Sequence, residues 1–497
     1  MKFKRASGVL MHISSLVSNS GIGTLGKEAY EFVDFLKQSN QSYWQILPIC
    51  PTSFGDSPYQ SFSTFAGNPY FIDLDILAKE GYLAPEDYKN IAWESNETTV
   101  DYPLIFKNRN KVFLKLQQNF KNNIPKDFFD FCAENFYWLE DYALFMAVKD
   151  EFSGKEYTLW EEDIKKREQT ALNKWRNKCK ERIEYYKILQ YFFFKQWFAL
   201  KEYANKNGIK IIGDLPIYVA ADSADVWSNL KNFVLNKDLT PKVVAGCPPD
   251  SFSKEGQLWG NPVYNWRYMK FDRYSWWLKR LEASLKIYDV VRIDHFRGFE
   301  GYYTIKYGSK NACNGKWKKG PSMAFWRFVK QKLGDVPIIA EDLGFLTNGV
   351  RKMLKRSGFP GMKVLQFAFS GDMENEYLPH NYKNNCVVYT GTHDNDTLLS
   401  WVETLNQKEV EFTKKYLQCS KEEIAEKVMV AAMSSVADLC ILTMQDLIGL
   451  GGESRMNTPS TVGQNWKWRM TAQQKDKEII TKLSNYTNIY GRKGKNE

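Results

Sequence analysis

The sequence contains very little of what builds metal or redox sites. Only four of its 497 residues are histidine, and none of them stands in an HExxH pattern. Its eight cysteines are widely separated and never form a CxxC pair. This spacing excludes the common zinc and dithiol motifs, so we expect no metal and no cofactor. It favours free thiols, which are typical of a reducing compartment.

Long apolar runs are missing as well. Lys2, Lys4 and Arg5 resemble the start of a signal peptide, but the apolar stretch Ala6–Met11 is short and His12 interrupts it. No run approaches the roughly 20 apolar residues that a membrane-spanning helix needs. We therefore expect no membrane partner and a cytoplasmic location.

An excess of charge of one sign is also lacking. The chain has 68 Lys and Arg against 58 Asp and Glu, which gives a net charge of +10. The basic residues are scattered, and the longest cluster is the tail Arg492–Lys495. Because a nucleic-acid site needs a concentrated basic surface, we expect no nucleic-acid partner. There is no internal repeat, and a 43% apolar, 25% charged composition is that of an ordinary globular protein.

What the sequence does contain is a series of short apolar runs, several of which end in polar or acidic residues. Helical patterns separate several of these runs, at 24–39, 275–286, 324–333 and 348–356. Alternation of helices with eight strands is typical of the α/β class and of a (β/α)8 (TIM) barrel, which needs roughly 250 residues. The eight predicted strands are 7–13, 43–49, 209–219, 288–296, 337–344, 363–369, 386–394 and 440–449.

The rest of the chain must form insertions in a single barrel spanning 1–497. Residues 51–208 follow the second strand and far exceed the roughly 2–6 residues of an ordinary loop. They are rich in Lys, Glu and aromatic residues, which favours an inserted, mostly helical subdomain. A second insertion, 220–287, holds the Gly- and Pro-rich stretch 246–262. Only 48 residues (497 − 449) follow the eighth run, too few for a C-terminal β-domain of roughly 100 residues.

One dinucleotide-binding pattern is a false signal. Gly21–Gly26 reads GIGTLG, but several residues separate it from the preceding strand. The next strand ends in Leu47–Cys50 (LPIC) and lacks the acidic residue that would hold a ribose. The stretch is better interpreted as a loop that enters the first barrel helix.

Acidic residues follow four of the predicted strands. Since the carboxyl ends of barrel strands form the active-site face, these carboxylates should converge there. A single one of them could simply cap the next helix, but four together would repel one another, a cost typical of functional sites. The four strand ends are Gly213–Asp214, Arg292–His295, Ala340–Asp342 and Thr392–Asp396.

Two of these strand ends can be interpreted in more detail. Arg292 and Asp294 are two residues apart on a strand and share a face, so the guanidinium would favour the ionised carboxylate that a nucleophile requires. A structural ion pair is the alternative. Glu341 and Asp342 are adjacent, so only one can point inward, and the spacing does not say which.

Seven segments together resemble the amylomaltase, or 4-α-glucanotransferase, family of the α-amylase superfamily. The resemblance runs from about Ser7 to Arg469 and implies an α-amylase-type barrel without the C-terminal β-domain. The segments are RIDHFRG (292–298), AEDLG (340–344), GTHDND (391–396), GDLPIYVAADSADVW (213–227), SPYQSFSTFAGNPYFIDL (57–74), AGCPPDSFSKEGQLWGNPVYNW (245–266) and SRMNTPSTVGQNWKWR (454–469).

The resemblance also implies roles for individual residues. Asp294 becomes the nucleophile, Glu341 the general acid and base, and Asp394 the carboxylate that holds hydroxyls of the reacting sugar. The positions that match substrate contacts are Tyr59, Asp214, Trp259, Arg292, His393 and Asn465. Trp259 lies in the stretch 246–262, the candidate active-site loop that would cover the site and keep water out.

Two positions depart from the family pattern. Val17 stands where Pro is usual, and Ser460 stands where Gly is usual. Ser460 bears on the backbone near Asn465, because Gly reaches dihedral angles that Ser disfavours.

The implied activity is transfer of α-1,4-glucan segments to the 4-hydroxyl of an acceptor glucan or glucose, by a retaining double displacement. The expected partners are maltooligosaccharides and α-1,4-glucans, and the sequence makes no prediction of oligomeric state. The alternatives are an α-1,4-glucan hydrolase of the α-amylase or α-glucosidase type and a non-catalytic glucan-binding protein.

Overall fold

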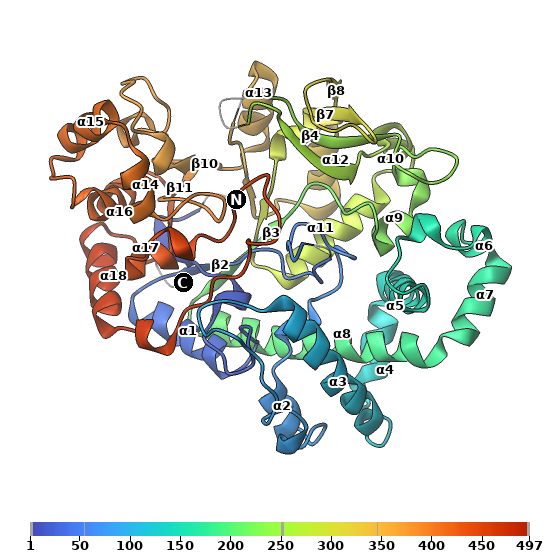
Figure 1. The fold of residues 1–497 in the computed structure, drawn as a ribbon. Helices are drawn as coiled ribbons and strands as arrows, with labels where there is room; N and C mark the ends of the chain where they lie inside the picture. Colours follow the sequence, from blue (N-terminus) through green and yellow to red (C-terminus); the bar gives the residue numbers. More distant parts are fainter. Residues whose placement is uncertain (1–2, 54, 250–252, 345, 495–497) are drawn as a thin grey trace.

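The fold is built around a barrel of eight parallel strands (Figure 1). A computed structural model describes residues 3–53, 55–249, 253–344 and 346–494. Seven barrel strands fall largely within the predicted runs, and β10 begins two residues before its run, so the predicted α/β barrel is confirmed. The strands are β1 (Ala6–Leu10), β2 (Tyr43–Gln45), β3 (Lys210–Leu215), β6 (Val290–Ile293), β9 (Ile338–Ala340), β10 (Gly361–Val364), β11 (Cys386–Tyr389) and β12 (Leu439–Thr443).

The sheet order is β10-β11-β12-β1-β2-β3-β6-β9, and the two ends meet. The N–H of Ala340 in β9 donates to the carbonyl of Pro360 just before β10, at 3.0 Å. This bond joins the outer strands and nearly closes the barrel. Strands β1, β6, β11 and β12 are buried at every position, as expected for parallel strands covered on both faces.

An apolar run can be longer than its strand, because a capping residue can begin a helix within the run. The run 440–449 holds β12 and then a short helix, α17 (Met444–Ile448). The hydroxyl of Thr443 accepts from the N–H of Asp446 at 3.3 Å and so begins that helix.

The four predicted helices are confirmed, and they follow apolar periodicity. In α1 (Lys27–Gln38) the buried residues Ala29, Phe32, Val33 and Leu36 recur at helical spacing and face the core. The others are α11 (Ser275–Ile287), α12 (Ser322–Leu333) and α13 (Asn348–Ser357). Further helices surround the barrel: α9 (Ala224–Ser228), α10 (Trp266–Phe271), α14 (Leu398–Thr404), α15 (Gln407–Leu417), α16 (Ile424–Ser434) and α18 (Lys477–Ile489).

The chain between β2 and β3 is dominated by helices, at the lower right of Figure 1. The last of them, α8, has 27 residues and leads directly into β3. The indole N–H of Trp197 in α8 donates to the carbonyl of Ile287 at 3.2 Å, so α8 also covers the barrel. The helices are α2 (Leu74–Lys79), α3 (Tyr102–Phe120), α4 (Asp127–Glu134), α5 (Phe136–Glu151), α6 (Glu162–Lys165), α7 (Gln169–Lys178) and α8 (Lys180–Lys206).

A second, antiparallel sheet was not predicted. Its order is β5-β4-β7-β8, with β4 (Val243–Cys247), β5 (Gln257–Pro262), β7 (Gly301–Lys306) and β8 (Lys316–Lys319). The stretch 246–262, predicted as a loop, therefore forms most of a β-hairpin, although residues 250–252 lie outside the described residues. Strand β4 of this hairpin also pairs with β7, which follows β6 in the chain. The composition of the stretch 246–262 therefore does not reveal that it forms strands.

The first barrel strand and the last described residues are joined by a hydrogen bond. Arg492 is buried, and its guanidinium donates to the carbonyls of Ala6 at 3.0 Å and of Met433 at 2.6 Å. After β12, the described residues form α17, α18 and connecting segments and no further sheet.

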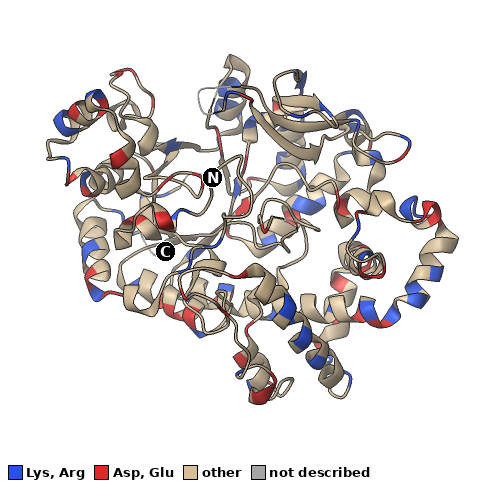
Figure 2. Ribbon diagram, viewed as in Figure 1, with Lys and Arg blue, Asp and Glu red and all other residues tan. Residues whose placement is uncertain are grey.

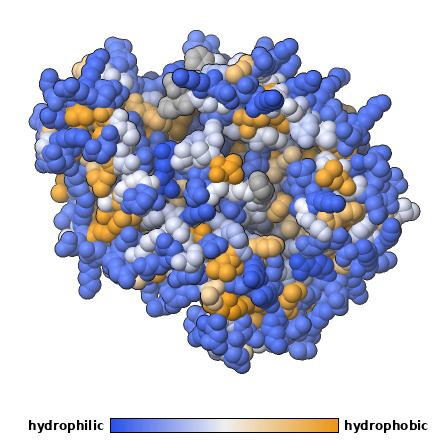
Figure 3. Space-filling model, in the orientation of Figure 1, coloured by the Kyte–Doolittle hydropathy of each residue, from blue (hydrophilic) through white to orange (hydrophobic). Residues whose placement is uncertain are grey.

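Charged residues of both signs are interspersed over the helices in Figure 2. The face in Figure 3 is mainly hydrophilic with small apolar patches. Across the described ranges, no helix combines the length and apolar character needed to cross a membrane.

Candidate active site

The carboxyl ends of β3, β6 and β9 are held in a fixed stagger. Asp214 in β3 lies beside Arg292 in β6. The backbone ladder then continues beyond the strands, because Asp294 N–H donates to Leu215 O and Glu341 N–H donates to Ile293 O, each at 3.0 Å. This register brings Asp214, Asp294 and Glu341 to one end of the barrel, as the strand-end argument predicts.

A buried guanidinium joins two of these carboxylates. Arg292 Nη1 donates to Asp214 Oδ2 at 2.6 Å, and Arg292 Nη2 pairs with Asp294 Oδ1 at 3.1 Å. Asp214 and Arg292 are almost fully buried, whereas 30% of the Asp294 side chain is exposed. Burial raises the pKa of Asp294, and the charge of Arg292 opposes this rise. The ion pair thus favours an ionised Asp294 at the open edge of the network.

Glu341 points toward this network and Asp342 points away from it. The Glu341 carboxylate accepts two backbone hydrogen bonds, from His295 N–H at 2.6 Å and from Leu343 N–H at 2.7 Å. Asp342 Oδ1 instead accepts from the N–H of Met362 in β10 at 2.6 Å. The two adjacent residues therefore differ in role: Glu341 faces the β6 end, and Asp342 helps to join β9 to β10.

Burial raises the pKa of both carboxyl groups. For Glu341 the charge of Arg292 and the two backbone N–H groups oppose the rise. The pKa of Asp342 rises to about 6 because of burial, against the opposing Met362 N–H. A carboxyl with a raised pKa retains its proton closer to neutral pH, which a general acid requires.

Tyr59 extends the network toward β11. Its hydroxyl donates to Asp214 Oδ2 at 2.7 Å, and its ring stacks on His393 with centroids 5.0 Å apart. Burial, with the nearby Asp214 charge, raises the pKa of Tyr59, and burial lowers that of His393, so both groups are neutral at pH 7. Trp466 packs against both rings.

Asp394 follows β11 on the other side of His393. Its side chain is 46% exposed, and Oδ1 lies 3.3 Å from His393 Nε2. The same oxygen accepts from Asn457 Nδ2 at 2.6 Å, and Arg455 Nη2 donates to the Asp394 carbonyl at 2.7 Å. A segment near the C-terminal end of the chain thus fixes an exposed carboxylate beside the buried network.

Trp259 reaches the site from strand β5. Its ring meets His295 edge-on with centroids 4.8 Å apart, and its indole N–H donates to Gln257 Oε1 at 3.0 Å. Gln60 Nε2 donates to the Trp259 carbonyl at 3.3 Å, which links the hairpin to the segment that carries Tyr59. Trp259 therefore packs against His295, whose backbone N–H donates to the carboxylate of Glu341.

Asn465 differs from the other predicted contacts. Its side chain accepts from Thr458 N–H at 3.0 Å and donates to Thr461 O at 3.0 Å, so it holds its own loop together. Within this loop Ser460 has φ +66°, in the left-handed region that favours glycine. The expected backbone conformation is thus present although the residue is Ser.

The family model described as 4-alpha-glucanotransferase matches residues 11–475. This chain belongs to the 4-α-glucanotransferase family. It is 52% identical to a 4-alpha-glucanotransferase of Clostridium butyricum, over 97% of this chain and 100% of the relative. It is 47% identical to a 4-alpha-glucanotransferase of Streptococcus pneumoniae, over 99% of this chain and 98% of the relative.

Solved structures agree with this family assignment. An amylomaltase from Streptococcus agalactiae in complex with acarbose superposes with a TM-score of 0.97 at 45% identity, over 98% of this chain and 100% of that one. An amylomaltase from Corynebacterium glutamicum shares the fold, with a TM-score of 0.79 at 17% identity, over 97% of this chain and 75% of that one.

Several contacts of this 4-α-glucanotransferase family site were not predicted from the sequence. Asn457, Arg455 and Trp466 lie in the recognised segment 454–469, but only Asn465 was singled out there. His295 contributes a backbone N–H from a left-handed conformation with φ +50°, which no side-chain pattern reveals.

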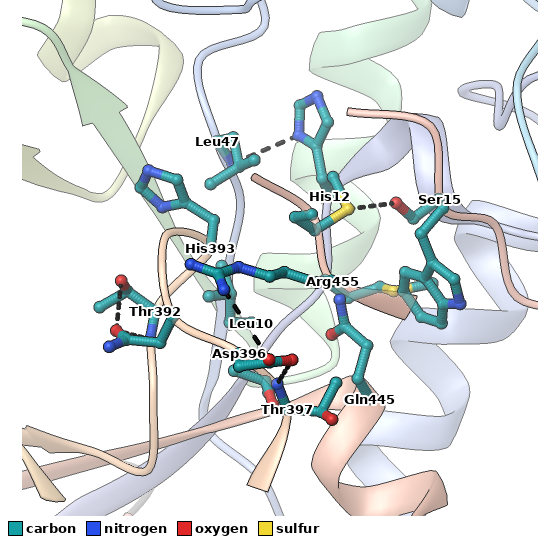
Figure 4. A pocket seen from close by; sticks show the side chains of 15 residues that line it. Leu10, His12, Ser15, Leu47, Thr392, His393, Asp396, Thr397, Gln445 and Arg455 are labelled. Carbon is teal, nitrogen blue, oxygen red and sulfur yellow. Dashed lines mark hydrogen bonds and ion pairs between the residues drawn. The ribbon is translucent and has the colours of Figure 1, made fainter. Parts of the chain in front are cut away.

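His393 also lines a small pocket (Figure 4). His12, Gln445, Asp396 and Arg455 are among its polar lining, and burial lowers the pKa of His12 to about 3. A search of the described residues finds no group of three or more His, Cys, Asp or Glu side chains arranged to hold a metal ion.

Proposed function

We propose that this protein transfers α-1,4-glucan segments from a donor to the 4-hydroxyl of an acceptor glucan or glucose. The observation that carries the proposal is the Arg292-linked pair Asp214–Asp294, with Glu341 on the neighbouring strand end. The full-length similarity to proteins named 4-alpha-glucanotransferase supports the same activity.

In the first step, Asp294 attacks the anomeric carbon of the donor. The bond from that carbon to the glycosidic oxygen breaks, and the proton of Glu341 goes to the leaving oxygen. The product is a covalent glycosyl ester of Asp294 with an ionised Glu341. Arg292 favours this step because its charge opposes the effect of burial and stabilises the ionised form of Asp294.

In the second step, the acceptor enters with its 4-hydroxyl. Glu341 takes the proton of that hydroxyl, the acceptor oxygen bonds to the anomeric carbon, and Asp294 leaves as a carboxylate. The two inversions give net retention. Together the two steps return Glu341 and Asp294 to their starting protonation states.

The remaining site residues are proposed to position the sugar. Asp394, whose exposed carboxylate is fixed by Asn457, accepts hydrogen bonds from hydroxyls of the reacting glucose. His393 donates in the same region, and Tyr59 and Asp214 form the floor. Asn465 acts by holding the loop that carries Asn457 and Trp466.

Transfer prevails over hydrolysis only where water is kept from the glycosyl ester. The β-hairpin with Trp259, linked to the Tyr59 segment through Gln60, is suited to that shielding. We propose that the enzyme works in the cytoplasm, where its eight free cysteines would stay reduced.

The test is incubation with maltotriose alone, followed by chromatography and a count of reducing ends. A transferase yields glucose plus a ladder of longer maltodextrins, while total reducing ends stay nearly constant. A steady rise in reducing ends without longer products would indicate an α-1,4-glucan hydrolase instead. Binding without any product would indicate a non-catalytic glucan-binding protein.

A further inference from the structure

A second, larger pocket lies between the helical insertion and the barrel, and none of the nine predicted site residues lines it. Its walls come from α5, from the region of α9, and from α10 and α11, and α5 packs against α9 (Figure 1). Its cavity volume is about 340 Å³. Ligand pockets typically measure about 300–1,000 Å³, so this one has room for a small molecule or a chain segment.

Aromatic rings form one wall of this pocket. Phe65 is buried, stacks nearly parallel on Trp138 at 6.4 Å and meets Trp276 edge-on at 6.3 Å. Tyr137 meets Phe65 edge-on at 5.8 Å and is 45% exposed. The buried rings hold Tyr137 in place, and its exposed surface is available to a flat apolar ligand face such as that of a pyranose.

The charges in the pocket balance. Arg167 Nη2 donates to Asp141 Oδ1 at 2.7 Å, and the guanidinium lies 4.2 Å from the ring of Trp227. The pocket has equal numbers of acidic and basic side chains, so it favours a neutral ligand with hydroxyl groups over an anion. These are Asp141, Asp225, Asp272, Arg167, Lys231 and Lys279.

The exposed aromatic ring of Tyr137 and the balanced charge together match a saccharide.

One short segment connects this pocket to the catalytic carboxylates. Tyr59 donates to Asp214 in the active site, and Phe65 lines the pocket six residues later. Six residues span at most about 22 Å, so a long glucan could contact both places. The link is firm, since Thr64 N–H donates to Asp225 Oδ2 at 2.7 Å.

We propose that this pocket is a second binding site for an α-1,4-glucan chain, which retains a distant part of a long donor during transfer. The proposal rests on the proposed function only for the identity of the sugar. Because the pocket would hold glucose units that the active site does not hold, it acts on long donors and not on a short donor such as maltotriose.

The test compares donors of different length in the variants Tyr137→Ala and Lys279→Ala. Loss of the Tyr137 contact should raise KM for long amylose by about fivefold. KM for maltotriose and kcat for both donors should stay unchanged. Phe129→Ala is the matched control, because Phe129 is 62% exposed on α4 and does not line the pocket. Unchanged KM for amylose in both pocket variants would overturn the proposal.

A binding measurement separates this proposal from the proposed function. Calorimetry with maltotriose, a chain short enough to bind in each place separately, should find two bound molecules per protein in the Asp294→Asn variant, and one after Tyr137→Ala is added. One chain in both variants would overturn the second site, whatever the activity of the enzyme. Failure of the wild type to disproportionate maltotriose would instead refute the proposed function alone.

Discussion

Glu341 and its neighbour Asp342 should respond very differently to loss of charge. In Glu341→Gln the sugar leaving group receives no proton, and general acid catalysis contributes about 10²- to 10⁴-fold. Transfer from ordinary glucans should fall by that factor, which is about 2.7–5.4 kcal/mol of barrier. Chromatographic assay of maltotriose disproportionation measures the loss.

The fold must be checked in the same variant, because Glu341 accepts from two backbone N–H groups. A glutamine has one carbonyl oxygen, so its amide nitrogen would face the second N–H donor. Leaving that donor unsatisfied costs about 1–3 kcal/mol of the free energy of unfolding. Denaturant unfolding therefore accompanies the kinetic assay and shows whether the barrel remains folded.

Assays with an α-glucosyl fluoride distinguish the loss of general acid catalysis from a disrupted active site. Fluoride leaves with little proton help, so Glu341→Gln should still form the glycosyl ester on Asp294. That ester should accumulate, because no base remains for the acceptor hydroxyl, and mass spectrometry detects it. Azide needs no deprotonation and should restore turnover.

Asp342→Asn is the matched control. An asparagine carbonyl can still accept from Met362 N–H, so the junction of β9 and β10 is kept. This variant should show neither accumulation of the ester nor rescue by azide. If it trapped the ester while Glu341→Gln behaved normally, the assignment of the two side chains would be refuted.

Four further outcomes are expected. Asp294→Asn should abolish both transfer and hydrolysis while glucan binding persists in calorimetry; activity within about tenfold of wild type would exclude it as the nucleophile. Asn457→Ala removes a charge-assisted hydrogen bond to Asp394 and should lower kcat/KM about 10- to 100-fold with an unchanged melting temperature. Ser460→Gly should raise the free energy of unfolding by about 1 kcal/mol, because φ is +66° there; a decrease would contradict the strain argument. Burial raises the pKa of Asp225 to about 6, so ionisation above the unfolded pKa destabilises the fold as pH rises from about 4 to 6. Asp225→Asn should therefore gain stability relative to wild type over that range, by up to about 3 kcal/mol in denaturant unfolding.

The barrel could be predicted because its strands are buried on both faces and read as continuous apolar runs. Val290–Ile293 and Leu439–Thr443 are examples in which every residue is buried. The ends of the runs were less informative, since the predicted run 440–449 continues beyond the strand into Met444–Ile448, which forms a helix. The Thr443 cap makes the difference, and hydrophobicity does not show it.

The second sheet could not be predicted for a different reason. Strand β8 is exposed at all four positions and reads KWKK, with no alternation of apolar and polar residues. It pairs only with β7, and β7 pairs in turn with β4, far back in the chain. The stability of β8 thus depends, through β7, on the distant strand β4, and a local pattern does not show that pairing.

Some residues of the candidate site could be predicted from the sequence and others could not. Asp214, Asp294 and Glu341 could be found because carboxylates after buried strands are chemically conspicuous. The choice between Glu341 and Asp342 needed the family resemblance, since alternation alone cannot assign a face at the end of a strand. Asn457 is a neutral amide in a loop, and only the folded chain brings it beside Asp394.

The position of β1 in the barrel has a consequence for biosynthesis. This first strand lies between β2 and β12, and Arg492 bonds to the carbonyl of Ala6 at its start. The ribosome synthesises β1 long before β12. The backbone N–H and C=O groups on the β12 side of this apolar strand therefore stay unpaired through most of translation. Chains stalled before residue 443 would expose that edge and aggregate or occupy chaperones, so the barrel closes only in the last stage of synthesis.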